Sequence, residues 1–351
     1  MIGLKKKIQV MTKNYTSKFQ SGNNIIYCQP EKQRRFPKLK RVIILMMLLI
    51  LTALPSFANE GWESASFDLR KAFPNNSAPP ERLKPLHELA PLTNNEGVIR
   101  RVRLAEGVKA VALTFDMCEL DTVTTGCDMA VINFLRERKI PATLFMGGKW
   151  MRTHSRRVKQ IMSEGGIFEI GNHNWSHGNC ALLSEEGLRA QVLWTQSEYE
   201  LLREEAGVND IPEVPELFRL PYGRNNERSL KVLSELGMRV IQWDVAAEAG
   251  NNSDVKRARR SAVKVAGMTG PGSILLFHAN LVPKGTVNLL SELVNILEGE
   301  GYEFVKVSEL LKMGEAETVR DGYFSRPKDN YALDNKFGVD GTGRRVRFTG
   351  E

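Results

Sequence analysis

The chain has 351 residues, of which 42% are hydrophobic and 26% are charged, a composition typical of a globular protein with one large domain or two small ones. Its net charge of +8 would suggest an anionic partner, but residues 1–58 hold 11 Lys or Arg and a single acid. The rest of the chain keeps 38 basic and 40 acidic residues, a net charge of about −2. This balance argues against a nucleic-acid partner.

Residues 1–58 have the pattern of a signal peptide. Lys38, Lys40 and Arg41 precede an apolar run over 42–54, which ends shortly before Ala58. This run has 13 residues, fewer than the roughly 18 to 20 that cross a bilayer as a helix. We therefore expect cleavage after Ala58, no stable membrane anchor, and a periplasmic or secreted mature protein.

Export would place three cysteines in an oxidising compartment, namely Cys118, Cys127 and Cys180. A bridge between Cys118 and Cys127 would close a short loop and stabilise the fold by roughly 2 to 3 kcal/mol. Three buried thiols are an equally good interpretation, so the pairing stays open at this point.

The body of the chain begins after an irregular lead-in over 59–107, rich in Pro, Asn and Glu. From 108 to 311, short apolar runs alternate with amphipathic segments. The expected strands are 110–115, 142–146, 168–171, 217–220, 239–243, 273–277 and 303–306. The expected helices are 128–138, 154–164, 184–205, 227–236, 254–266 and 287–298. This alternation predicts parallel βα units, in an α/β barrel or a doubly wound sheet. Residues 312–351 are charged and contain several Gly, and we expect a mobile polar tail.

Polar side chains follow the ends of several expected strands, where the chemistry of βα folds is found. They are Asp116, His173, His177, Arg219 and His278. The two histidines at i, i+4 suit a divalent metal. Each of the five has an ordinary structural explanation when taken alone. Together they supply a carboxylate base, metal ligands, an arginine and a second acid or base, the set required for metal-assisted hydrolysis.

Four motifs in this order resemble those of the polysaccharide deacetylases, the NodB-homology family or carbohydrate esterase family 4. They are Leu113-Thr-Phe-Asp116, Glu169-Ile-Gly-Asn-His-Asn-Trp-Ser-His177, Phe218-Arg-Leu-Pro-Tyr-Gly223 and Leu275-Leu-Phe-His278. The resemblance covers 108–311, including a closing segment at 301–310. It implies a single catalytic domain with the fold of a distorted (β/α)7 barrel.

The resemblance also implies a role for each matched residue. Asp116 would be the general base and Arg219 would orient it, while His173 and His177 would bind a divalent metal. Zinc is the first expectation for this metal, with cobalt or nickel as alternatives.

Three further roles follow from the same resemblance. His278 would protonate the leaving amine, and Leu275 would line the space for the acetyl methyl group. The backbone N–H of Tyr222 would help to hold the oxyanion. The implied reaction removes an N-acetyl group from a hexosamine-containing polysaccharide such as peptidoglycan, a chitin-like oligomer or an exopolysaccharide.

The sequence departs from the family pattern directly after the base. The family has an aspartate there as third metal ligand, whereas this chain has Met117, a soft thioether. A carboxylate from Glu119, Asp121 or Asp128 could assist the metal, and we favour Glu119. Asp128 has an alternative role as the N-cap of the first helix.

A second departure concerns the group that tunes His278. The family has an Asp and a Trp where this chain has residues 246–249, Ala-Ala-Glu-Ala, so that group stays open. These departures motivate one alternative to the N-deacetylase, a glycan-binding pseudoenzyme. A second alternative is an esterase that removes O-acetyl groups from a glycan with the same residues. The oligomeric state is left open.

Overall fold

The structure is a computed structural model that describes residues 78–94, 97–121 and 123–341. The expected signal peptide lies outside the described residues, as do the first part of the lead-in and residues 342–351. None of the helices within the described ranges is long and apolar enough to cross a membrane.

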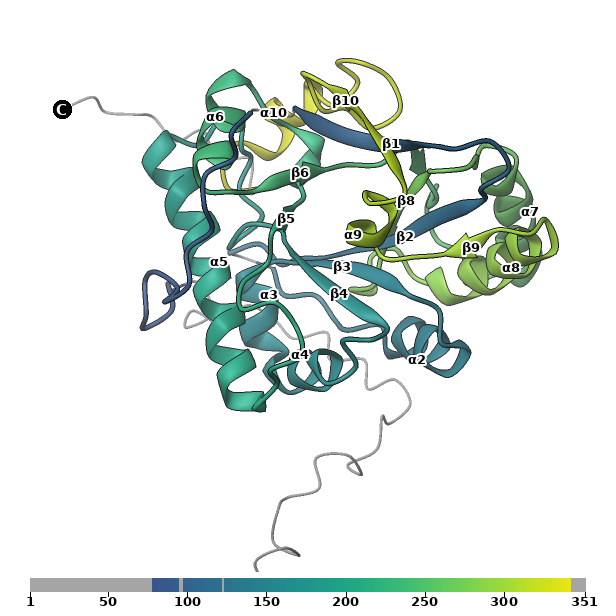
Figure 1. Cartoon of the computed structure of the whole chain (residues 1–351), viewed down its shortest axis with the longest axis horizontal. Coiled ribbons are helices and arrows are strands. Elements are labelled where there is room, and N and C mark those ends of the chain that lie inside the picture. The colour runs from purple at the N-terminus through teal and green to yellow at the C-terminus, as the bar shows by residue number, and fades with distance from the viewer. Residues whose placement is uncertain (1–77, 95–96, 122, 342–351) are drawn as a thin grey trace, which may run out of the picture. The chain divides into compact units, whose positions relative to one another are not determined.

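A curled sheet forms the centre of the fold (Figure 1). Its strands are β1 Val98–Leu104, β2 Ala110–Met117, β3 Ala142–Met146, β4 Phe168–Asn172, β5 Leu217–Phe218, β6 Arg239–Ile241, β7 Val245–Ala246, β8 Ile274–His278, β9 Glu303–Phe304 and β10 Gly314–Val319. They follow the order β10-β1-β6-β5-β4-β3-β2-β8-β7, and β9 also pairs with β2. The ladder between β1 and β10 is antiparallel, and the other ladders described are parallel. This α/β architecture confirms the expected barrel-like fold.

Helices connect the strands, and most of them cover the outside of the curl (Figure 1). They are α2 Met129–Arg138, α3 Gly148–Thr153, α4 Ser155–Met162, α5 Glu185–Ala206, α6 Glu227–Glu235, α7 Val255–Ala266, α8 Thr286–Gly299, α9 Val307–Leu310 and α10 Ala332–Phe337. Local signals explain several of the helix starts. Ser184 caps α5 and Asp254 caps α7, and Asp128 accepts a hydrogen bond from the Val131 N–H as the N-cap of α2. Asp128 is therefore a helix cap, as one of its two interpretations predicted.

The central strand β2 is buried on both faces, which is why it reads as an almost continuous apolar run. Side chains of alternate residues point to opposite faces of a strand. Val111, Leu113, Phe115 and Met117 pack in the core that includes α2 and α8. Ala110 and Ala112 belong to a second core inside the curl, where α9 lies (Figure 1). Asp116 therefore shares the inner face of β2, and Met117 faces outward.

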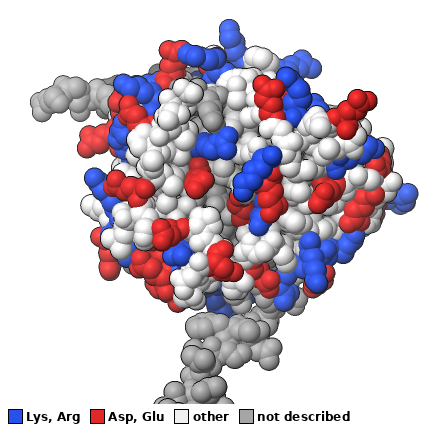
Figure 2. Space-filling view, in the orientation of Figure 1, with Lys and Arg blue, Asp and Glu red and all other residues white. Residues whose placement is uncertain are grey.

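The charges of the body are mixed on its surface. On the face in Figure 2, acidic and basic side chains are interspersed over the described part of the chain. This distribution agrees with the small net charge expected once residues 1–58 are set aside.

The lead-in and the tail are more ordered than the sequence suggested. Strand β1 lies within the expected lead-in and pairs with β10, which lies within the expected mobile tail. Arg103 of β1 donates hydrogen bonds to Glu315 and Glu317 of β10. Strand β1 carries three arginines, and the edge strand β10 has no fully buried residue. The apolar alternation of this pair was therefore too weak to reveal two strands.

Helix α10 also falls in the expected tail, and it is tied to the body by a charged contact. The Asp334 carboxylate accepts hydrogen bonds from Arg224 Nε at 2.8 Å and from a terminal nitrogen of Arg224 at 2.6 Å. It accepts a third from Asn179 Nδ2 at 2.8 Å, and the Asn179 N–H donates to the Val339 carbonyl. The described part of the tail is therefore held against the loops that follow β4 and β5.

We predict that Asp334→Ala releases α10 from the body. The variant leaves the buried Arg224 guanidinium without its partner, so we expect a loss of about 1–3 kcal/mol in the local opening free energy. Limited proteolysis with mass spectrometry should show faster cleavage within 332–341. Asp321→Ala, at an exposed position, is the control. Equal cleavage rates in the two variants would contradict the prediction.

The same contact should depend on pH. Burial opposes ionisation of Asp334, but the hydrogen bonds from Arg224 and Asn179 outweigh it and lower the pKa of this carboxyl. A lowered pKa means that the stabilisation is present above the ordinary carboxyl pKa and is lost as pH falls through the folded value. Cleavage in the wild type, measured with an acid-tolerant protease, should therefore rise toward acid pH. In Asp334→Ala it should change little.

Candidate active site

Strand register brings the polar side chains to one edge of the sheet. Asp116 of β2 pairs directly with His278 of the neighbouring strand β8. On the other side, β3 pairs with β4 and β4 with β5, so His173 and Arg219 each follow a strand that ends at the same edge. The parallel arrangement therefore gathers residues that lie far apart in the sequence.

A buried ion pair joins Asp116 to Arg219. The Arg219 side chain is 0% exposed, and one terminal nitrogen lies 2.9 Å from Asp116 Oδ1 and 2.7 Å from Thr114 Oγ1. Its other nitrogens donate to the carbonyls of Ile241 and Gln242, at 3.2 and 3.1 Å. Burial lowers the pKa of this guanidinium and Asp116 opposes that shift. The pair fixes the Asp116 carboxylate in one orientation.

His173 presents one nitrogen to the site. Its Nδ1 lies 2.9 Å from the Arg219 carbonyl, which assigns the proton to Nδ1. Its Nε2 is buried, has no hydrogen-bond partner among the described residues, and lies 3.6 Å from Asp116 Oδ2. The His173 and His177 rings meet edge to face, with centroids 4.8 Å apart. An unpartnered lone pair beside a second imidazole is typical of a metal ligand.

Both imidazoles are held in the neutral form that binds metals. Burial lowers the pKa of His173 and lowers that of His177 well below its usual value. Positive charge on His173 or His278 would add to the effect at His177. Neither ring therefore gains a proton near neutral pH.

The third potential ligand is a thiol. Cys118 Sγ and the nitrogens of His173 and His177 all lie within 4.8 Å of one another. Cys118, Cys127 and Cys180 are free, so no Cys118–Cys127 bridge is present. Two imidazoles and a sulfur form a donor set that fits a borderline divalent ion such as Zn²⁺.

The structure does not bring Glu119, the carboxylate favoured from the sequence, into this group. Its oxygens accept hydrogen bonds from the Thr125 N–H at 3.0 Å and from Thr153 Oγ1 at 2.8 Å. Burial raises the pKa of Glu119 to about 7. The side chain turns away from the histidines and anchors its own loop.

Glu248 is the partner of His278 that the sequence left open. Its Oε2 lies 2.8 Å from His278 Nδ1, and Thr286 donates to its Oε1. Burial alone would lower the pKa of His278, but the hydrogen bond and the charge of Glu248 outweigh it and raise the pKa. The contact leaves Nε2 of His278 available to the site. Glu248 follows β7 by two residues, and this position after a strand end was the available signal.

Leu275, which we expected to line the space for an acetyl group, does not face the site. It is fully buried on the outer face of β8, in the core that contains Leu113 and Phe115. Leu276 packs in the inner core and, two residues before His278, shares its face of the strand. Leu276, not Leu275, therefore lies on the face of β8 that carries His278.

Tyr222 borders the site on the side of the described tail. It has a φ of +57° in a short turn over Pro221–Gly223, a left-handed conformation that non-glycine residues rarely adopt. Its ring meets the His177 ring edge to face at 4.4 Å and stacks on Phe337 of α10 at 5.0 Å. The tail thus forms part of the rim, which the sequence did not indicate.

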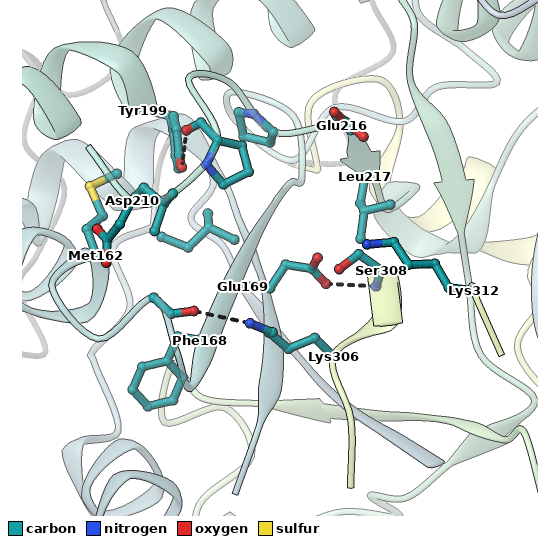
Figure 3. A pocket seen from close by; sticks show the side chains of 15 residues that line it. Met162, Phe168, Glu169, Tyr199, Asp210, Glu216, Leu217, Lys306, Ser308 and Lys312 are labelled. Carbon is teal, nitrogen blue, oxygen red and sulfur yellow. Dashed lines mark hydrogen bonds between the residues drawn. The ribbon is translucent and has the colours of Figure 1, made fainter. Parts of the chain in front are cut away.

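A cavity of about 310 Å³ lies elsewhere, at the opposite edge of the sheet, where β4 and β5 begin (Figure 3). Several of its polar groups are paired with protein atoms. Glu169 accepts hydrogen bonds from Thr143 and from the Ser308 N–H, and Lys306 donates to the Gly165 carbonyl. We therefore place the active site at the edge that holds Asp116, not in this cavity.

Comparison with known proteins defines the class. The family model for polysaccharide deacetylase matches residues 104–241. A peptidoglycan-N-acetylglucosamine deacetylase from Bacillus cereus is 32% identical over 207 residues, which cover 58% of this chain and 89% of that relative. The chain belongs to the polysaccharide deacetylase family, carbohydrate esterase family 4, a family of hydrolases.

Two further relatives show the range of this family. The peptidoglycan-N-acetylglucosamine deacetylase PgdA from Listeria monocytogenes is 29% identical, with 70% of this chain covered. The match spans only 49% of PgdA, about half its length. Among solved structures, a pseudoenzyme of the same family from Bacillus anthracis superposes with a TM-score of 0.50. It is 24% identical, covers 63% of this chain and 70% of its own, and supports the fold alone.

We predict that Glu248→Gln lowers the pKa of His278, because the variant removes the charge that raises it. NMR titration of the His278 ring measures this directly. The family resemblance implies that His278 is a general acid, which acts in its protonated form, so the alkaline limb of the pH profile of kcat/KM should move to lower pH. Glu303→Gln, on the exposed position of β9, is the control. An unchanged His278 titration in Glu248→Gln would show that this carboxylate does not tune the acid.

Proposed function

We propose that the protein is an exported, metal-dependent hydrolase that removes N-acetyl groups from a hexosamine-containing polysaccharide, with peptidoglycan as the first polymer to test. The observation that carries this proposal is the position of Asp116. Its Oδ1 is held by Arg219, its Oδ2 lies beside the unpartnered Nε2 of His173, and His278 lies directly across the β2–β8 ladder. The peptidoglycan deacetylases among the relatives support the choice of polymer.

The residues divide the reaction between two proton transfers. His173 and His177 would hold a divalent ion, which would supply polarisation of the amide carbonyl and a lowered pKa for water. Asp116 accepts a proton at Oδ2 as water adds to the carbonyl carbon. The backbone N–H of Tyr222 donates to the developing oxyanion. His278 gives a proton from Nε2 to the amide nitrogen as the C–N bond breaks, which yields acetate and a free amine.

Two alternatives use the same residues. A pseudoenzyme is favoured by Met117, which replaces the family's third ligand, but Asp116, Arg219, His278 and Glu248 form a complete acid–base set. An O-acetyl esterase would need the same base and the same ion. Acetate release from matched N-acetylated and O-acetylated glycans, with and without a chelator, separates the three. No release from any glycan would overturn the enzyme, and release from O-acetylated glycans alone would favour the esterase.

We predict that Asp116→Asn abolishes acetate release but keeps the metal, because the histidines bind the ion and the new side-chain amide retains a hydrogen-bond acceptor for Arg219. His278→Ala should lower kcat by roughly 10²- to 10⁴-fold, as expected for the loss of an acid or base. Metal content per protein and acetate release are measured on the same samples. Near-normal release by either variant would contradict the assigned roles.

Export gives a separate prediction. The mature protein should begin at Asn59, since Ala58 ends the signal-like segment. N-terminal sequencing of protein from the cell envelope measures this. Ala58→Arg, which removes the small residue that signal peptidases require, should leave the segment uncleaved. Recovery of envelope protein that still begins at Met1 would exclude this cleavage.

A further inference from the structure

The end of β2 shows why the family's third ligand position cannot serve in this chain. Met117 follows Asp116 and points to the opposite face of the strand, where it is 0% exposed among Leu113, Phe115 and other outer-core side chains. A thioether would be a poor ligand for a hard or borderline ion in any case. Coordination from this segment must therefore come from a residue beyond Met117.

We propose that Cys118 is the third protein ligand, so that the ion is held by one thiolate and two imidazoles. This inference rests on the proposed metal site at His173 and His177. The Cys118 sulfur lies within 4.8 Å of the ligand nitrogens of both histidines. His173 is 1% exposed and its Nε2 is directed into this space without a hydrogen-bond partner among the described residues. Three donor atoms from separate positions in the chain thus converge on one point.

The loop around Cys118 is fixed by hydrogen bonds that leave its sulfur directed to the histidines. The Cys118 carbonyl accepts from Thr125 Oγ1 at 2.9 Å and from Asn280 Nδ2 at 3.2 Å. The same Asn280 nitrogen lies 3.9 Å from Sγ, where it can stabilise a thiolate. The next residue, Glu119, accepts hydrogen bonds from the Thr125 N–H and from Thr153 Oγ1. Glu119 is therefore a positioning residue for Cys118.

The thiolate supplies the negative charge that the family's aspartate would have supplied at the position of Met117. Two neutral imidazoles leave a divalent ion with its full charge, whereas a thiolate cancels one unit and still leaves a fourth tetrahedral position open. As the sulfur–metal bond forms, the S–H bond breaks and the thiol proton leaves to solvent. Sulfur ligation favours Zn²⁺ and Co²⁺ over Mg²⁺ and Mn²⁺. It also makes the site sensitive to thiol reagents.

Cobalt spectroscopy of the metal-free protein tests the ligand without recourse to activity. Wild type titrated with Co²⁺ should develop visible d–d bands and a near-ultraviolet band from sulfur-to-cobalt charge transfer. Cys118→Ser should lose the charge-transfer band. Loss of a residue that hydrogen-bonds to a metal ligand lowers affinity by roughly 10- to 100-fold. Loss of the ligand Cys118 itself should lower the Zn²⁺ affinity by more than that. Cys118→Asp should keep the visible bands without the charge-transfer band. Cys127→Ser, at a buried thiol outside the site, should retain both sets.

Alkylation of the wild type provides a measurement that does not depend on a variant folding. Peptide mapping after iodoacetamide treatment should show Zn²⁺ protecting Cys118 more than Cys127. Visible cobalt bands without a charge-transfer band in wild type would overturn thiolate ligation and leave the proposed reaction standing. A charge-transfer band that depends on Cys118, with no acetate released from any glycan, would support the ligand and overturn the proposed reaction. Failure to bind Co²⁺ or Zn²⁺ at all would overturn the ligand assignment.

Discussion

The ion pair between Arg219 and Asp116 is the interaction on which the rest of the site depends. Arg219 follows β5 and Asp116 lies near the end of β2, and β4 and β3 lie between these two strands in the sheet. The 2.9 Å contact can therefore form only because the sheet curls and brings the two strand ends together across its interior. A guanidinium buried there would be costly without full pairing. Thr114 and two backbone carbonyls complete its partners, so the pair joins β2, β5 and the end of β6.

Successive side chains of a strand point to opposite faces of the sheet, and this alternation decides which of them reach the site. Asp116 and His278 share the inner face of neighbouring strands, whereas Met117 and Leu275 lie in the outer core. A ligand directly after Asp116 would have to leave the strand geometry in order to turn inward. In this chain the apolar Met117 reinforces the outer core instead, and the proposed coordination comes from the loop. The position of Cys118 is a consequence of that alternation.

The sequence predicted the regular part of the fold because its signals are local. The expected strand at 142–146 has the bounds of β3, and the expected helix at 184–205 differs from α5 by one residue at each end. Polar residues at strand ends also indicated the site, since parallel strands must end at one edge. The partners set by tertiary contacts were not predictable in this way. Glu248 meets His278 across 30 residues of sequence, and Glu119 is drawn from the site by Thr125 and Thr153.

The tail shows a related limit of sequence reasoning. Residues 332–341 have little apolar periodicity, because only one face of a short helix contacts the body. Their contacts are nevertheless specific: Asp334 binds Arg224, and Phe337 stacks on the ring of Tyr222. Asn330 Nδ2 adds hydrogen bonds to the carbonyls of Tyr222 and Gly223. Such bonds stabilise the left-handed turn at Tyr222, which would otherwise be strained.

The site therefore extends well beyond the segment that defines the family. The matched region ends at 241, before Glu248, His278 and α10. The β2–β8 ladder brings His278 back to Asp116, and Glu248 follows because β7 pairs with β8. The matched segment contains Asp116, His173 and His177, whereas His278, Glu248 and the support for Tyr222 come from later in the chain. The proposed acid–base chemistry thus requires the whole curl, because neither half of the sequence contains both Asp116 and His278.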